Sequence, residues 1–219
     1  MEKRDSAFKI AIPRIPKQLK EAESWEEVTD ASSEELEGYS FRSCSFSPVS
    51  ETHYSVQACR FMNCSFSESS FKKSQFCDVI FVNCDLSNAN WAECSFCRVE
   101  FIECKLMGAN LQGGTFTHVS FVGNQGRYLV ASMSKWNTVQ FLSNQFQGAA
   151  FDNCTLNKVI FESCNLTETE FHQTSLRGID LRSSEIIGIR LTGPELRQTV
   201  VTSMQAAWLA RLLGVVVKD

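Results

Sequence analysis

Several features that would indicate a membrane, secreted or nucleic-acid-binding protein are missing from this sequence of 219 residues. No apolar run approaches the ~20 residues that span a bilayer. Lys9, Arg14 and two prolines interrupt the N-terminal stretch in which a signal peptide needs an apolar run. The formal net charge is −4, so no basic excess indicates direct nucleic-acid binding. Ten cysteines without a secretion signal predict reduced thiols in a cytoplasmic protein.

Sequence signatures of catalysis are missing as well. The chain contains no GxSxG, Walker, HExxH or GxGxxG pattern. Its three histidines, His53, His118 and His172, have no evident partner residues in the sequence. We therefore expect a protein that is not an enzyme and has no catalytic residues, no metal site and no cofactor.

Phenylalanine is abundant and regularly spaced. Sixteen of the seventeen Phe recur in one five-residue register, which runs from Phe41 to Leu191. The register visits thirty-one positions, and twenty-seven of them are Phe, Leu, Trp or Ile; the exceptions are Glu51, Val56, Gly126 and Ala131. A period of five fits neither a helix nor a strand. It fits a chain that turns a corner every five residues and points one large side chain inward from each side.

A longer period of twenty residues indicates four sides per coil. One side gives an unbroken column of expected core residues: Phe41, Phe61, Phe81, Phe101, Phe121, Phe141, Phe161 and Leu181. Two residues before each centre lies a second, smaller inward position, which eight of the ten cysteines occupy. These eight are spaced by multiples of five with no C-x2-C among them, so we interpret them as packing residues and not as zinc ligands. The sequence predicts an all-β fold, a four-sided parallel β-solenoid.

The ends of the chain depart from the repeat. We expect an N-terminal cap with an acidic segment over residues 1–35, about eight coils over 36–198, and a C-terminal helix followed by a short strand over 199–219. Thr202 and Gln205 have the spacing of a capping box, Gly214 suits the helix stop, and "VVV" at 215–217 has the composition of a strand. One face of this helix is too apolar to stay exposed, so it caps its own rod or joins another.

Blocks such as "CDLSNANW" and "CKLMGANL" are similar to the A(D/N)LXX consensus of pentapeptide-repeat proteins. Members of that family are right-handed quadrilateral parallel β-helices. The order of repeat, connector and helix ending in "LLGVVV" resembles the Qnr-type quinolone-resistance branch, especially its Gram-positive chromosomal members. The resemblance implies a tail-to-tail homodimer whose interface would be formed by Met204, Trp208, Leu209, Leu212 and Leu213. It also implies mimicry of DNA, binding to DNA gyrase and topoisomerase IV, and protection of these enzymes from fluoroquinolones.

The charge distribution qualifies the expectation of DNA mimicry. Residues 39–191 contain thirteen acidic and twelve basic residues, whereas residues 1–38 contain ten acidic and six basic ones. Any mimicry must therefore depend on local patches or on the N-terminal acids. The unbroken register leaves no room for projecting loops, but two irregular stretches suggest partner contacts at Glu51, His53, Tyr54, Arg127 and Tyr128.

An outward column is unexpectedly apolar and keeps a second function class open. It consists of Met62, Val82, Ile102, Val122 and Leu142, one residue after the centres on successive coils. Either the apolar N-terminal stretch folds back over this column, or the column binds a partner of an interaction scaffold. Cys77 and Cys97 also face outward, one coil apart, and are the two thiols that oxidation could reach.

Overall fold

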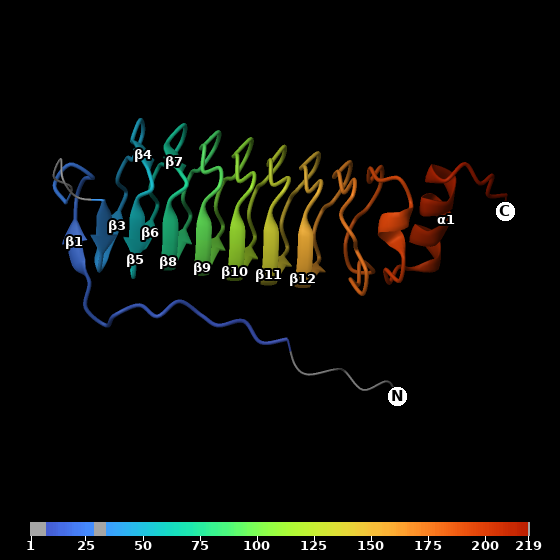
Figure 1. The fold of residues 1–219 in the computed structure, drawn as a ribbon, viewed down its shortest axis with the longest axis horizontal. Helices are drawn as coiled ribbons and strands as arrows, with labels where there is room; N and C mark the ends of the chain where they lie inside the picture. The colour runs from blue at the N-terminus through green and yellow to red at the C-terminus, as the bar shows by residue number, and fades with distance from the viewer. Residues whose placement is uncertain (1–7, 29–33, 219) are drawn as a thin grey trace.

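The computed structural model describes residues 8–28 and 34–218, and the repeat stacks into one long rod with α1 at its C-terminal end (Figure 1). The strands are β1 (Lys20–Ala22), β2 (Glu35–Glu37), β3 (Tyr39–Arg42), β4 (Ser50–Thr52), β5 (Ser55–Gln57), β6 (Arg60–Met62), β7 (Ser70–Lys72), β8 (Gln75–Val82), β9 (Ser95–Ile102), β10 (Thr115–Val122), β11 (Lys135–Leu142) and β12 (Thr155–Glu162). A 3-10 helix, η1 (Pro194–Leu196), and the α-helix α1 (Ser203–Leu212) complete the described chain.

The strands pair in parallel at a fixed offset of twenty residues. Phe61 pairs with Phe81, and Phe81 pairs with Phe101. Isolated bridges continue this register to Asp180 and Val200. Successive parallel strands at a constant offset require a chain that returns to the same side once per coil. The predicted parallel β-solenoid is therefore confirmed.

The five-residue period has a cause in the backbone. The residue two positions after most of the inward centres has a positive φ, for example Asn63 at 54°, Asn83 at 52° and Glu103 at 54°. One left-handed residue redirects an otherwise extended chain, so each such residue makes a corner. Strands β8 to β12 run through a corner of this kind and therefore cover two sides of the rod each; Asp78, with φ 57°, bends β8.

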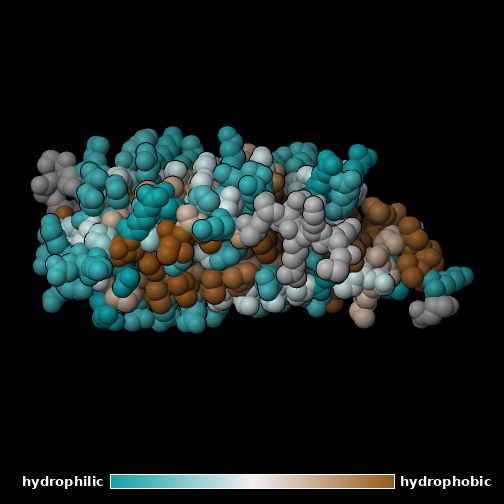
Figure 2. Space-filling view, turned by 90° about the horizontal axis from the view of Figure 1, so that it is seen from below, coloured by the Kyte–Doolittle hydropathy of each residue, from teal (hydrophilic) through white to brown (hydrophobic). Residues whose placement is uncertain are grey.

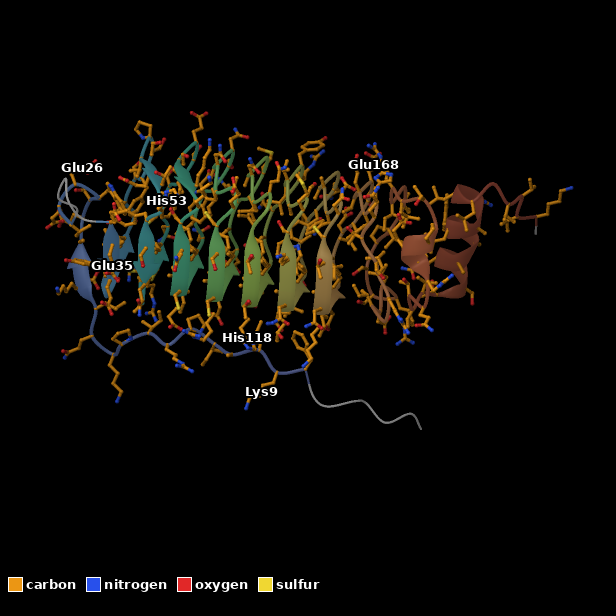
Figure 3. All side chains as sticks on the ribbon, viewed as in Figure 1. Lys9, Glu26, Glu35, His53, His118 and Glu168 are labelled. Carbon is orange, nitrogen blue, oxygen red and sulfur yellow. The ribbon has the colours of Figure 1, made fainter. Side chains whose placement is uncertain are left out.

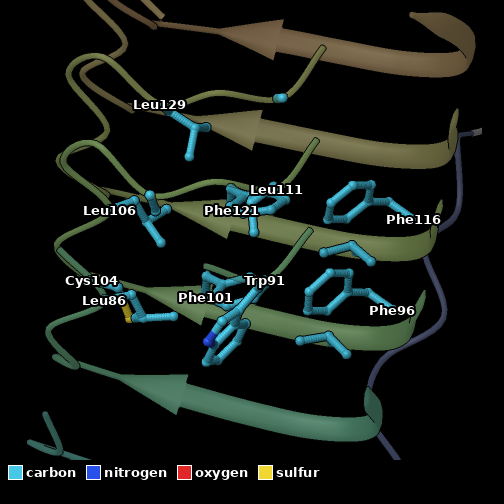
Figure 4. Close-up of a cluster of buried hydrophobic side chains, with 14 of the residues drawn as sticks. Leu86, Trp91, Phe96, Phe101, Cys104, Leu106, Leu111, Phe116, Phe121 and Leu129 are labelled. Carbon is cyan, nitrogen blue, oxygen red and sulfur yellow. The ribbon is translucent and has the colours of Figure 1, made fainter. Parts of the chain in front are cut away.

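The core consists of stacked aromatic side chains (Figure 4). The rings of Phe81 and Phe101 lie 5.0 Å apart at an interplanar angle of 4°. All eight members of the predicted column from Phe41 to Leu181 are at most 1% exposed. Where the repeat has Gly126 in place of a large side chain, the ring of Phe146 fills the space, since a Cβ on Gly126 would lie 2.6 Å from it. The core prediction is confirmed.

The smaller inward position, two residues before each centre, has a hydrogen-bonding role as well as a packing role. Cys104 Sγ lies 3.6 Å from the carbonyl oxygen of Phe81. On the next coil Asn124 Nδ2 donates to the carbonyl oxygen of Phe101 at 3.0 Å. The eight cysteines predicted at this position are all buried: Cys44, Cys59, Cys64, Cys84, Cys94, Cys104, Cys154 and Cys164.

The N-terminal end of the rod is closed by residues that precede the repeat. Strand β1 adds to β3 with Lys20 opposite Tyr39, a nineteen-residue offset in place of twenty. Trp25 then packs on the first coil, with its ring 5.7 Å from that of Phe46 and 5.6 Å from that of Phe71. Trp25 is 6% exposed, so this segment covers core that the first coil would otherwise expose to water.

Helix α1 closes the other end and has the capping contacts that its sequence predicts. The Thr202 side chain accepts a hydrogen bond from the backbone N–H of Gln205. In return, the Gln205 side chain accepts one from the backbone N–H of Thr202. At the C-terminus Gly214, with φ 81°, donates to Arg211, and Val215 donates to Ala210, which is a Schellman motif. Gln205 Nε2 also donates to the carbonyl oxygens of Leu181 and Ser184, both at 2.9 Å, and thereby fixes the helix on the last coil.

The expected strand over residues 215–217 does not form. This segment has no regular secondary structure, and Val215 and Val216 are 53% and 79% exposed. A β-strand needs a neighbouring strand for its backbone hydrogen bonds, and the described chain ends its ladder at Val200. Composition alone therefore predicted the wrong structure here.

Candidate functional site

The contact residues predicted near the N-terminal end divide into exposed and buried ones. His53 is exposed, Glu51 is half-buried, and both belong to or follow the short strand β4. Tyr54 is only 2% exposed, so its prediction as a partner contact is wrong. Its ring lies 5.0 Å from that of Trp25, and both rings belong to the core.

Arg127 and Tyr128 do form an exposed patch. The Tyr128 side chain is 57% exposed, and the Arg127 guanidinium lies 5.4 Å from the centre of its ring. Met107, one coil before Arg127, is 50% exposed and lines a depression of about 70 Å³ together with Lys105 and Arg127. The sequence interpretation missed Met107, although its place twenty residues before Arg127 marks the same outward column.

Acidic side chains gather at the end of the rod opposite to α1. Glu26 and Glu35 mark this end in Figure 3. The exposed carboxylates of this acidic end are Glu21, Glu23, Glu26, Glu27, Glu34, Glu35 and Glu37. Residues 1–7 and 29–33, with Asp30 among them, lie outside the described residues.

The predicted apolar column is half-buried along its length. Met62, Val82, Ile102, Val122 and Leu142 are all in the intermediate range of exposure. The extended N-terminal segment runs along the rod, antiparallel to the direction in which the coils advance (Figure 1), at a corner four residues before the column. Two of its backbone N–H groups reach the rod: that of Ala11 donates to His118 Nδ1 at 3.3 Å, and that of Arg14 donates to Asp78 Oδ1 at 2.8 Å.

Cys77 and Cys97 lie beside this contact and share an arginine. They are opposite each other on β8 and β9, and the Arg98 guanidinium lies 3.1 Å and 3.2 Å from their sulfur atoms. Arg98 also holds both carboxylate oxygens of Asp78 at 2.6 Å. Burial raises the pKa of Cys77 to about 11, and the charge of Asp78 adds to the effect. Burial also acts to raise the pKa of Asp78, but the hydrogen bonds from Arg98 and Arg14 outweigh it and lower that pKa.

The C-x2-C pair formed by Cys94 and Cys97 is divided between two environments. Cys94 is 1% exposed and its sulfur faces the carbonyl oxygen of Phe71, while Cys97 is half-buried on the outside. One side chain in the core and one on the outer surface do not converge on a metal. The spacing therefore has no ligand role here.

One group of side chains has a geometry that a metal ion would fit. Ligand atoms of Asp152, Glu170 and His172 lie within 4.8 Å of one another among the described residues. Each of these residues already has protein partners. Asp152 Oδ1 accepts from the His172 backbone at 2.8 Å, and Glu170 Oε1 accepts from Arg190 Nη1 at 2.8 Å. The sequence did not suggest this group because its members come from two coils.

Helix α1 exposes most of the residues predicted for a dimer interface, and Figure 2 shows apolar side chains at this end of the rod. Met204 is 74% exposed, Trp208 44%, Leu212 49% and Leu213 55%. Leu209 is 7% exposed and belongs to the core of its own chain, so its prediction as an interface residue is wrong. The helix turns Leu209 toward the last coil, as it does Gln205. Beside the exposed face lies an apolar cavity of about 320 Å³, lined in part by Ile187, Trp208 and Leu212.

The repeat also matches a known family at the level of sequence. A profile described as "Pentapeptide repeat region" matches residues 54–129 and 94–171, which together cover more than half of the chain. This chain belongs to the pentapeptide-repeat family. No curated protein matches the sequence.

One solved structure has a similar fold, and others match more weakly. A trypsin-treated variant of QnrB1, a plasmid-mediated fluoroquinolone resistance protein, matches with a TM-score of 0.56 and 21% identity, over 91% of this chain and 99% of that chain. Full-length QnrB1 matches with 20% identity and a TM-score of 0.35, over 90% and 98% of the two chains. HetL, involved in heterocyst differentiation regulation in the cyanobacterium Nostoc sp. strain PCC 7120, matches with 12% identity and a TM-score of 0.37, over 76% and 86%. Within the described part of this pentapeptide-repeat protein, no helix is long and apolar enough to cross a bilayer.

Proposed function

We propose that this chain is a binding protein of the Qnr type, which engages a type II topoisomerase, DNA gyrase or topoisomerase IV, and protects it from fluoroquinolones. One observation carries the proposal: nearly the whole chain, 91% of it, matches a QnrB1 structure, and that protein confers fluoroquinolone resistance. A solenoid whose functional features are surfaces is suited to binding and not to catalysis.

The physical basis of the interaction would be electrostatic and would be strongest at the acidic end. The sides of the rod are nearly neutral, so they do not reproduce the uniform charge of DNA. Seven exposed glutamates concentrate negative charge at one end of a rigid body. Charge of this kind attracts a cationic DNA-binding surface and increases the rate of association. We infer that mimicry of DNA depends on this end of the rod.

The proposal includes a homodimer formed by the C-terminal helices. The exposed apolar side chains of α1 are Met204, Trp208, Leu212 and Leu213, and exposed apolar groups of this kind mark an interface. Joining two rods through α1 would place the two acidic ends at opposite tips of the dimer. Each tip would then be available to an enzyme.

Gyrase supercoiling in the presence of ciprofloxacin tests the proposal. Graded amounts of the purified chain should restore supercoiling over a defined range of concentration. A variant with Glu26, Glu27, Glu34 and Glu35 replaced by glutamine should need more protein for the same effect. If the wild-type chain neither restores nor inhibits supercoiling at any concentration, the topoisomerase proposal fails.

A second candidate function is that of an interaction scaffold with a different protein partner. The half-buried apolar column on β6 and β8 to β11 favours it, because five successive apolar residues on an outer face are unusual for a solvated solenoid side. A chain with this function would bind its partner without affecting gyrase in the presence or absence of drug.

A further inference from the structure

The N-terminal segment 8–16, here called the strap, covers one corner of the rod. This corner is formed by the positive-φ residues of strands β8 to β12 and their counterparts on neighbouring coils. Along it, Ala58, Asp78 and Thr138 are 7%, 6% and 8% exposed, Arg98 and His118 are half-buried, and Lys158 is exposed. The corner that follows Phe61, Phe81 and Phe101 is exposed on every coil. The strap contacts this corner at Asp78 and His118, and Figure 3 shows it passing His118.

The strap is attached loosely compared with the strands. Between residues 8 and 19, Ala11 and Arg14 are the described residues whose backbone groups bond to the rod. Phe8, Ile10 and Ile15 are half-buried, whereas Ile12 is 69% exposed. A segment with two hydrogen bonds and partial apolar burial lies at the low end of local stability.

The two attachment points match the geometry of an extended peptide. His118 and Asp78 are two coils apart, which corresponds to about 9.6 Å at the usual strand spacing. Ala11 and Arg14 are three residues apart, which corresponds to about 10 Å in an extended chain. An extended backbone laid along this corner can therefore reach both acceptors at once. Both hydrogen bonds use backbone N–H groups of the strap, so this part of the recognition does not depend on its side chains.

The corner also accommodates apolar side chains. Lys9 and Arg14 are the polar residues of the strap, and Phe8, Ile10 and Ile15 are half-buried. Asp78 supplies a charged acceptor, which makes a stronger hydrogen bond than a neutral one. Its orientation is fixed by the bidentate contact with Arg98.

We propose that this corner is a peptide-binding site, in which the strap is a tethered self-ligand and which an extended apolar segment of another protein occupies by displacing the strap. The partner is recognised by apolar side chains that lie against the rod and by free N–H groups three residues apart. The strap competes at an effective concentration on the order of millimolar, as short tethers do, and so sets a threshold for the partner. The inference goes beyond topoisomerase binding and does not rest on it.

A labelled peptide of residues 8–17, FKIAIPRIPK, serves as the probe, and binding is measured by fluorescence anisotropy on full-length chains. Ile10→Asp with Ile15→Asp detaches the strap, because both side chains are half-buried. Ile12→Asp with Gln18→Asp is the matched control, because both residues are exposed and the charge change is the same. We expect the detached variant to bind the probe at least about tenfold more tightly than the wild type and the control do. A probe with Arg14→Pro, which lacks the N–H that reaches Asp78, should bind about tenfold more weakly.

Two results would overturn the proposal. In the first, the detached variant is folded, with the same circular dichroism spectrum as the wild type, but binds the probe no more tightly than the control variant does. The other is equal binding of the Arg14→Pro probe. If the detached variant does not fold, hydrogen exchange on the wild type decides instead. Excess unlabelled peptide should then remove the protection of the Ala11 and Arg14 amides, and unchanged protection at saturating peptide would also contradict the proposed site.

Discussion

At the scale of single residues, the inward position two before each centre has a chemical requirement on two of the four sides of the coil. Cys104, Asn124, Ser134 and Thr174 all occupy it, and each lies within hydrogen-bonding distance of the carbonyl oxygen twenty-three residues earlier. On these two sides most side chains at this position are small and carry a donor group, whereas the other two sides hold mainly valine and alanine there, for example Val79 and Ala89. The shared donor group explains why Cys, Asn, Ser and Thr replace one another on the first two sides, although their hydropathies differ.

Asn124 tests this requirement. Its side chain donates to Asn144 Oδ1 and the Phe101 carbonyl and accepts from the Cys104 N–H. Asn124→Leu should lower the free energy of unfolding by about 1–3 kcal/mol, since buried polar partners lose their hydrogen bonds. Cys104→Ser keeps a donor at the same kind of site and should change stability by less than about 1 kcal/mol. Urea titration followed by circular dichroism measures both. Equal losses in the two variants would show that volume, and not the donor, matters.

Cys77 provides a second test at this scale. Its pKa is raised from 9.0 to about 11 by burial and then by the neighbouring charge of Asp78. Because the thiolate is the reactive form, alkylation of Cys77 at pH 8 should be about a hundredfold slower in the native chain than in urea. A Cys97→Ser background isolates the thiol, and mass spectrometry of the labelled peptide gives the rate. The native rate should keep rising up to about pH 11. Equal native and unfolded rates would contradict the assignment.

The buried residues could be predicted from the sequence because the register is unbroken, so that position alone decides which side chains face inward. Tyr54 and Leu209 show where that reasoning stops. Tyr54 is at an inward position, but the irregular residues around it suggested a surface that contacts a partner. Leu209 is apolar like its exposed neighbours in the helix, so composition does not distinguish it from them. Which face of an amphipathic element meets the body of the protein depends on packing angles that composition does not contain.

At the scale of secondary-structure elements, the two ends of the rod use different solutions to the same problem. The N-terminal end uses β1 and Trp25, and the C-terminal end uses η1 and α1. The capping box of α1 could be read from the sequence, because it depends on residues three apart. The strap could be suggested only as one of two alternatives, because its contacts with Asp78 and His118 join residues 64 and 107 positions apart.

Glu195 in η1 predicts how acid weakens the C-terminal end. Burial acts to raise its pKa, but hydrogen bonds from Thr192, Gly193 and Gln173 outweigh burial and lower it from 4.5 to about 2. A lowered carboxyl pKa contributes stability above pH 4.5, and this stability is lost as pH falls toward 2. Glu195→Gln should therefore destabilise the chain at pH 7 by about 2–3 kcal/mol, and the difference from wild type should shrink toward pH 2.

Urea unfolding at a series of pH values measures this effect. The exposed Glu185→Gln variant is the control, and it should follow the wild type at every pH. A Glu195→Gln difference that does not depend on pH would show that the carboxylate is not what stabilises η1.

At the scale of the whole molecule, the rod has two unlike ends, one acidic and one apolar. The fold class was fully predictable, since a twenty-residue repeat allows one direct way of stacking. The functional surfaces were only partly predictable, because the exposure of Met107 and the pairing of Asp78 with Arg98 depend on which columns are covered.

The dimer is the first prediction at this scale. Light scattering after size exclusion should give twice the chain mass for the wild type. Trp208→Asp should give the monomer mass, because it places a charge in the apolar face of α1. Met107→Asp changes a side chain of similar exposure on the side of the rod and should leave the dimer mass unchanged. A wild-type chain that is monomeric at micromolar concentration would contradict the proposed dimer.

The most direct test of the topoisomerase proposal is the binding of the fluorescently labelled chain to purified gyrase, measured with and without linear duplex DNA. We expect saturable binding. Added DNA should weaken it because both ligands use the same cationic surface, and added salt should weaken it because the contact is electrostatic. Absence of binding, or binding that neither DNA nor salt affects, would contradict the proposal.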